Sequence, residues 1–134
     1  MRLVTALLTA AVLPLAACGG PSIELDDEVL QVIHASPHHG AIEVATDVVP
    51  RVGFNLPLER DQLAGVRLEV EEAGGFVEVA TSRVPRDEDR VVLLVPEAVL
   101  GGGQRYRLRV ERGVVAKGGM ELGAEFVAEF RTRE

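Results

Sequence analysis

Three histidines, His34, His38 and His39, lie within six residues of one another. Imidazole nitrogens are common ligands of zinc, copper and nickel, so three of them beside one turn could hold a transition metal. Cys18 is the single cysteine, which excludes an internal disulfide and a thiolate-rich metal cluster. A histidine-rich surface turn explains the same residues without a ligand. We therefore expect no cofactor and keep the histidines as candidate metal ligands.

The sequence gives little support to catalysis. None of its three serines lies in the Gly-x-Ser-x-Gly setting of a nucleophile elbow. The acidic runs Asp26-Asp27 and Asp87-Glu88-Asp89 fall in a predicted tether and a predicted turn, where solvated carboxylates are not tuned for proton transfer. Gly101-Gly102-Gly103 lacks the Lys-Ser/Thr that follows in a phosphate loop. We therefore expect a protein that is not an enzyme.

Composition and net charge limit the class of protein and the classes of partner that we expect. The 134 residues suit one folded domain, and 47% hydrophobic with 26% charged residues is ordinary for a globular protein. The formal net charge is −7, from 14 basic and 21 acidic residues, so nucleic acid is excluded as the expected partner.

The beginning of the chain is typical of an export signal. Arg2 precedes an apolar run, Leu3–Leu15, that is shorter than the roughly 20 residues of a membrane-spanning helix. The sequence Leu15-Ala16-Ala17-Cys18 that ends this run resembles the lipobox of bacterial lipoproteins. In that family the cysteine is acylated, with palmitate among the lipids, and becomes the first residue after cleavage.

This resemblance divides the chain into three parts. It implies a signal peptide over residues 1–17 and a lipidated Cys18 that begins a flexible tether over residues 18–28, leaving a folded domain over 29–134. Gly19 follows the cysteine where an aspartate would favour the inner membrane, so the resemblance implies an outer-membrane anchor.

From Val29 onward, hydrophobic residues recur with period two, which is typical of half-buried strands. Gly- and Pro-rich turns separate the runs, and short strands at this spacing predict an all-β fold, a β-sandwich of about seven strands. Gln62–Leu63 and Glu97–Leu100 are expected to form helical turns. The expected strands centre on residues 29–35, 52–54, 66–70, 76–80, 91–95, 106–110 and 126–130.

Ordered landmarks along this segment resemble the bacterial Ig-like domain of the S-layer protein type. The opening strand and turn run from Val32 through Ser36-Pro37 to Val44, and the closing strand ends in Phe130-Arg131-Thr132. The resemblance spans about Val29 to Arg133 and implies an Ig-like sandwich.

Tyr106 follows a glycine-rich corner, where its hydroxyl is expected to bond to upstream backbone in a tyrosine corner. The acidic and amide residues that many members carry before the last strand are missing from Val115–Leu122, which argues against calcium there.

A second family, the periplasmic copper-resistance Ig-like proteins, has a similar opening "H...SP..GA" segment. Its copper ligands include an N-terminal histidine and a later Asp-Gly-His segment, whereas here His34 is internal and no histidine follows His39. Because the opening segment is similar, a copper-binding periplasmic protein is kept as the alternative function, although these ligands differ.

One strand carries three arginines, Arg105, Arg107 and Arg109, on a single face. In an Ig-like sandwich the strands around residues 68, 108 and 128 share a sheet, so their outward side chains form one surface. That surface could bind an anionic partner such as a phosphorylated glycan, or it could be a ladder of cross-strand ion pairs. Its predicted members are Arg67, Glu69, Glu71, Arg105, Arg107, Arg109, Glu111, Glu125, Glu129, Arg131 and Arg133.

Together these features predict a non-enzymatic, lipid-anchored Ig-like module of the bacterial cell envelope, with a structural or interaction role. Its expected partners are the membrane, through Cys18, and an envelope protein or glycan.

Overall fold

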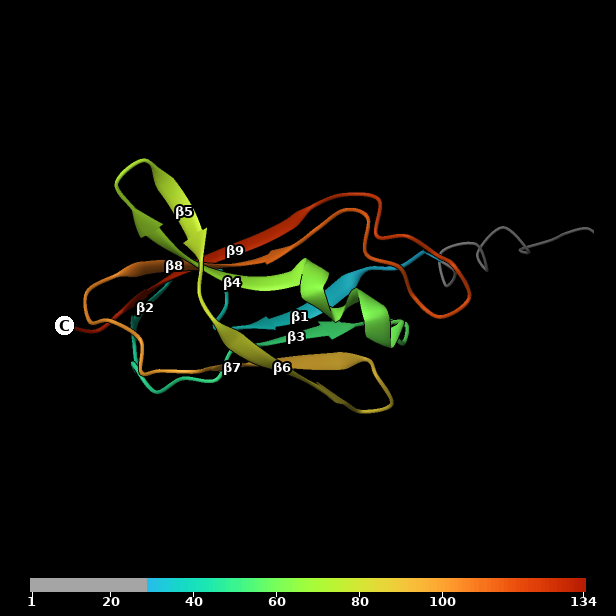
Figure 1. The fold of residues 1–134 in the computed structure, drawn as a ribbon, viewed down its shortest axis with the longest axis horizontal. Coiled ribbons are helices and arrows are strands. Elements are labelled where there is room, and N and C mark those ends of the chain that lie inside the picture. The colour runs from blue at the N-terminus through green and yellow to red at the C-terminus, as the bar shows by residue number, and fades with distance from the viewer. Residues whose placement is uncertain (1–28) are drawn as a thin grey trace, which may run out of the picture.

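The computed structural model describes residues 29–134, which form two β-sheets packed face to face, with one short 3-10 helix, Arg60–Gly65 (Figure 1). One sheet has the strand order β1-β3-β7-β6 and the other β2-β9-β8-β4-β5. The predicted all-β sandwich is confirmed, and Cys18 lies outside the described residues. The strands are β1 Val32–Ser36, β2 Ala41–Val44, β3 Arg51–Phe54, β4 Val66–Glu72, β5 Gly75–Glu78, β6 Thr81–Arg86, β7 Val91–Pro96, β8 Arg105–Val110 and β9 Phe126–Thr132.

The chain changes sheet at both edges of the sandwich. β1 belongs to one sheet and β2, which follows a cis Ser36–Pro37 bond, pairs in parallel with β9 in the other. On the opposite side, β5 is the edge of its sheet, and the chain then crosses to β6, the edge of the first sheet. These crossings close the two open sides of the sandwich.

Residues 29–134 form nine strands where the sequence predicts about seven, because β2 and β6 carry weak signals. β2 has four residues, and its Ile42 side chain points to solvent. β6 contains Pro85, which lacks a backbone N–H and which sequence patterns assign to a turn. An edge strand tolerates proline because one side of its backbone has no neighbour. The predicted helical turn at Gln62–Leu63 is confirmed within the 3-10 helix, whereas Glu97–Leu100 forms a bend without helix.

The core lies between the sheets and is almost wholly aliphatic. The inward residues of the alternating runs, such as Leu68, Leu94 and Leu108, are fully buried, as their spacing predicts. Each such side chain stabilises the fold by roughly 1.5–3 kcal/mol through removal from water. Tyr106 and Phe130 close one end of this core with rings stacked 5.6 Å apart.

The predicted tyrosine corner is confirmed. The Tyr106 hydroxyl accepts a hydrogen bond of 2.7 Å from the Gly101 N–H. Thr132 at the end of β9 completes the corner, because its Oγ1 donates to the Gly101 carbonyl at 2.6 Å and accepts from the Gln104 N–H at 3.0 Å. The start of β8, the end of β9 and the glycine-rich turn are therefore joined at one point.

At the other end of the sandwich, three loops meet at Asp89. This side chain is almost buried, and its carboxylate accepts from Lys117 Nζ at 2.6 Å and from Arg60 Nε at 3.1 Å. Its own backbone carbonyl accepts the Leu58 N–H at 2.8 Å. The hydrogen bond from Lys117 is the main cause that lowers the pKa of Asp89 below its ordinary value. Burial opposes this effect, and the charges of Arg60 and Lys117 lower the pKa further.

We expect Asp89→Asn to remove a stabilisation that depends on pH. A carboxylate whose pKa is lower in the folded state stabilises the fold above its ordinary pKa, near 3.8, and this contribution disappears as the pH falls through the lowered value. The unfolding temperature of the wild type should therefore exceed that of the variant at neutral pH, and the difference should shrink below about pH 4. Asparagine tolerates the positive φ at this position, so the variant isolates the charge.

Asp87→Asn, in the same turn but exposed and without an ion pair to a described residue, is the matched control. An Asp89→Asn difference that stayed constant down to about pH 2 would show that the charge is not what stabilises the three loops.

Candidate functional site

The strands that carry the predicted arginine face lie side by side. β4, β8 and β9 are neighbours in one sheet, as expected, and their outward side chains form one surface. The register places Arg107 between Glu69 on β4 and Glu129 on β9. Arg109 lies opposite Arg67, and Arg105 lies opposite Arg131. Two like-charged cross-strand pairs therefore need partners from elsewhere.

Glu69 is the centre of this face. Its carboxylate accepts from Arg107 Nε at 2.5 Å and lies 3.5 Å from Arg109 Nη1. The sequence predicts a solvated glutamate here, but Glu69 is only 4% exposed because the two arginine side chains cover it. The sequence could not reveal this burial, since it depends on the register of β4 against β8.

The flanking charges are paired in the same way. Arg109 also donates to Glu125, and this hydrogen bond raises the pKa of the guanidinium above its ordinary value. Arg67 Nη2 lies 2.5 Å from Glu111, which relieves its repulsion from Arg109.

Arg105 completes the set at the end of β8. It contacts Glu129 at 3.3 Å and Glu71 at 3.9 Å. Phe76 on β5 packs over Arg107, with the centroid of its ring 4.1 Å from the guanidinium carbon. All three arginines of β8 thus have carboxylate partners within the domain, an arrangement that favours an internal ladder over an open anion site.

The three histidines line one hollow of about 270 Å³ beside β1 and the start of β9. His39 Nδ1 accepts the Glu129 N–H at 3.0 Å, so this nitrogen already has a partner. Among residues 29–134, no group of three or more His, Cys, Asp or Glu side chains is placed to hold a metal ion.

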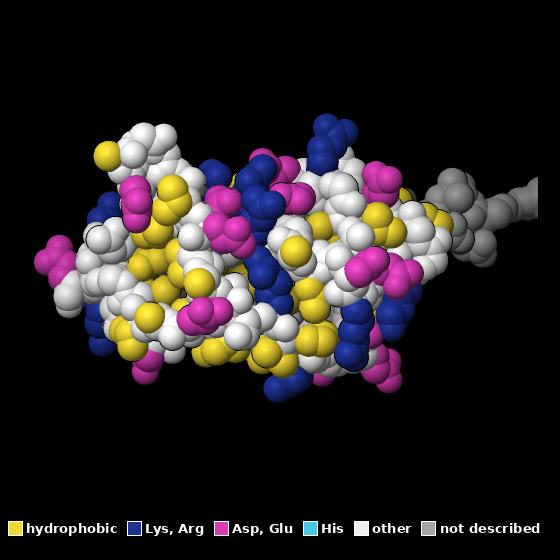
Figure 2. Space-filling view, viewed as in Figure 1, with side chains coloured by type: hydrophobic (Ala, Val, Ile, Leu, Met, Phe, Trp, Pro, Cys, Tyr) yellow, Lys and Arg dark blue, Asp and Glu magenta, His cyan; other side chains and the backbone are white. Residues whose placement is uncertain are grey.

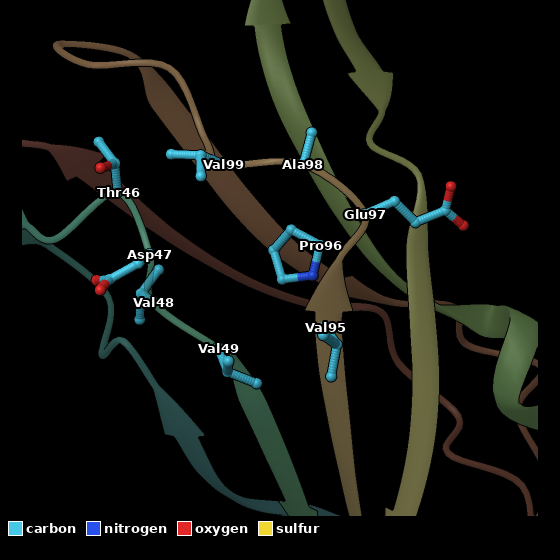
Figure 3. A pocket seen from close by; sticks show the side chains of 9 residues that line it. All are labelled: Thr46, Asp47, Val48, Val49, Val95, Pro96, Glu97, Ala98 and Val99. Carbon is cyan, nitrogen blue, oxygen red and sulfur yellow. The ribbon is translucent and has the colours of Figure 1, made fainter.

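Sequence reasoning missed an apolar surface at the end of the sandwich that carries the tyrosine corner. Two hollows, of about 360 and 570 Å³, adjoin there and share Glu97, Ala98 and Val99. Figure 3 shows Val99 pointing toward the Thr46–Val49 segment, whereas Glu97 points away from it. We call this surface the aliphatic trough. Its apolar lining is Val48, Val49, Val70, Val77, Val79, Ala80, Val95, Pro96, Ala98, Val99 and Leu100.

The sequence signal for the trough is the short apolar run Ala98-Val99-Leu100 after Pro96, in the segment for which a helical turn is expected. Figure 2 shows apolar atoms gathered in the hollow below β5, with acidic side chains and a band of basic side chains at its margin.

The chain belongs to the bacterial Ig-like domain family, whose model matches residues 26–132. The predicted family is therefore confirmed. No curated protein sequence matches the chain.

Solved structures with a similar fold belong to proteins of different kinds. The S-layer protein SbsC is similar with a TM-score of 0.53 and 12% identity, over 78% of this chain but only 14% of the SbsC chain. The copper resistance protein PcoC from Escherichia coli gives 0.63 and 14%, over 78% of this chain and 99% of PcoC. The alpha-2-macroglobulin of E. coli gives 0.57 and 16%, over 79% of this chain and 6% of that protein. At these identities the likeness establishes the fold.

We expect glutamine at Arg105, Arg107 and Arg109 together to lower the free energy of unfolding by about 1–3 kcal/mol, because the buried Glu69 loses its charged partners. Chemical denaturation measures this. Binding to vesicles that contain phosphatidylglycerol should not change, because the arginines are already paired within the domain.

The control replaces Arg51, Arg86 and Arg112, which lie outside the predicted face and form no ion pair with another described residue, and it removes the same charge. Loss of vesicle binding at unchanged stability, in the β8 variant alone, would overturn the ladder and support a site for anionic partners.

Proposed function

We propose that this protein is a non-enzymatic, lipid-anchored Ig-like module of the bacterial cell envelope that binds another envelope component. The observation that carries the proposal is the extent of the family match. The Ig-like domain occupies residues 26–132, directly after the segment that contains the lipobox-like Leu15-Ala16-Ala17-Cys18. An exported, anchored chain that carries an Ig-like sandwich directly after its tether has the organisation of a tethered interaction domain.

The similar fold of the surface-layer protein SbsC supports a place in the cell envelope. No helix within residues 29–134 is long and apolar enough to cross a membrane. The proposed attachment is through acyl chains at Cys18, and more than one chain is needed for stable anchoring.

The place where the described chain starts supports one orientation of the domain relative to the membrane. The described chain starts at the end of the sandwich opposite to β5 and the C-terminus (Figure 1). The residues from Cys18 to Val29 span at most about 36–40 Å when fully extended. A lipid at Cys18 would keep the Asp89 end near the membrane and present the end with the tyrosine corner to the surroundings.

The anchor is tested by metabolic labelling with an alkyne-palmitate in the native host. We expect the wild-type protein to be labelled and to fractionate with the outer membrane, whereas Cys18→Ser should lose the label and the membrane association. A control variant, Ser22→Cys in the Cys18→Ser background, should not restore labelling, because the new cysteine does not follow Leu-Ala-Ala. Mature wild-type protein that is unlabelled and starts at a residue other than Cys18 would contradict the anchor.

Metal binding is the second candidate, and one observation favours it: the three histidines line a single hollow in a fold similar to that of the copper resistance protein PcoC. It predicts stoichiometric binding of Cu²⁺ or Zn²⁺ in calorimetry that is lost in His38→Ala. If the protein is an interaction module without a metal site, we expect only heats of dilution for the wild type and for His38→Ala. Binding that survived His38→Ala would place the metal away from this hollow.

A further inference from the structure

Backbone hydrogen bonds fix the segment that carries Val99 at the centre of the aliphatic trough. The segment after β7 is held at both ends, because the Glu97 N–H donates to Ala80 O and the Leu100 N–H donates to Thr46 O, each at 3.1 Å. The Leu100 side chain is buried in the core, and Gly101 is held by the Tyr106 hydroxyl. Between these anchors Val99 is 74% exposed. A branched aliphatic side chain held in water by fixed backbone is preorganised to be covered by a partner.

The charged side chains that line the trough are all acidic, and basic side chains lie only at its border (Figure 2). Its two hollows are lined by four acidic residues and, in the described chain, by no lysine or arginine. Glu78 is paired with Arg83 at 2.8 Å, but Asp47, Glu72 and Glu97 form no ion pair with a described residue. This differs from the arginine face of β8, where the structure pairs each guanidinium. Three carboxylates therefore remain available to a positively charged partner.

We infer that the aliphatic trough binds an extended, cationic segment of another polypeptide, with branched aliphatic side chains at its centre and lysine or arginine on both sides. The aliphatic lining fits the centre of such a segment, and Asp47, Glu72 and Glu97 fit its flanks. This inference specifies the partner of the proposed envelope module and rests on that proposal for its setting.

Charge also decides against other occupants. A second copy of this chain would bring its own three carboxylates and a net charge of −7 to the contact. An anionic lipid surface would be repelled in the same way. The trough lies at the end of the sandwich far from Val29, so an anchor at Cys18 would leave it accessible (Figure 1).

Binding is tested with a fluorescent peptide that has alternating leucine and valine at its centre and two lysines at each end. Two comparison peptides carry glutamates in place of the lysines, or glycine and serine in place of the aliphatic residues. The full chain is purified from the fraction in which it is found. Protein from the membrane fraction is placed in phosphatidylcholine nanodiscs, and protein from the soluble fraction is kept in buffer. A failure of the lipid anchor therefore leaves this test intact.

We expect the cationic aliphatic peptide to bind at least about tenfold more tightly than either comparison peptide, with affinity that falls as salt rises. Val99→Ser should weaken binding by about five- to tenfold, because it removes an apolar contact. Glu97→Gln should weaken binding by about two- to threefold at low salt. Amide shifts in NMR spectra should move at residues 46–49 and 96–100.

The matched controls are Ile33→Ser, which removes an exposed aliphatic side chain (64% exposed) outside the trough, and Glu121→Gln, which removes an exposed carboxylate outside it. Neither should change the affinity. Equal binding of all three peptides, or binding unaffected by Val99→Ser, would overturn the inference. A concentration-dependent dimer that Val99→Ser dissociates would overturn it in favour of self-association, and tighter binding of the glutamate peptide would overturn its charge argument.

Discussion

The hydrogen bonds at the Gly101 corner join parts of the sandwich that are distant in sequence. Tyr106 holds the Gly101 N–H, and Thr132 holds the Gly101 carbonyl. Because Tyr106 also stacks on Phe130, the start of β8, the end of β9 and the preceding turn are joined by one set of contacts. The position of the segment before Gly101 follows from this constraint, and so do the shape of the aliphatic trough and the exposure of Val99. A fold contact in the family's closing motif thus also shapes the candidate binding surface.

Charge has two different roles on this molecule. On the β4-β8-β9 face and around Asp89, acidic and basic side chains are matched within the domain and stabilise it. Such pairs fix the register of the strands and the contact of the loops, since a shifted register would bury Glu69 without a cation. Around the trough, in contrast, Glu72 and Glu97 have no cation in the described chain, which leaves their charge available for recognition.

The Ig-like fold alone does not assign a function, because the S-layer protein SbsC and the copper resistance protein PcoC both share it. Function on such a sandwich depends on which of its surfaces is unpartnered. The three arginines of β8 are paired within the domain, and the histidine hollow has one nitrogen engaged by the Glu129 N–H. The trough combines exposed apolar area with unmatched charge, and it therefore carries the strongest argument for a partner.

The alternation around Leu68 and Leu108 determined the sheets and the inward residues, because side chains of a strand point to opposite faces whatever its neighbours are. Tyr106 after three glycines determined the corner for a similarly local reason. The weak strands β2 and β6, the burial of Glu69 and the trough were decided only by the tertiary structure. Each depends on which strands are neighbours and in what register, and a residue's own neighbours in sequence carry no information about that. Whether Glu69 is solvated or covered depends on Arg107 and Arg109, about forty positions away, so only the folded chain could bring them together.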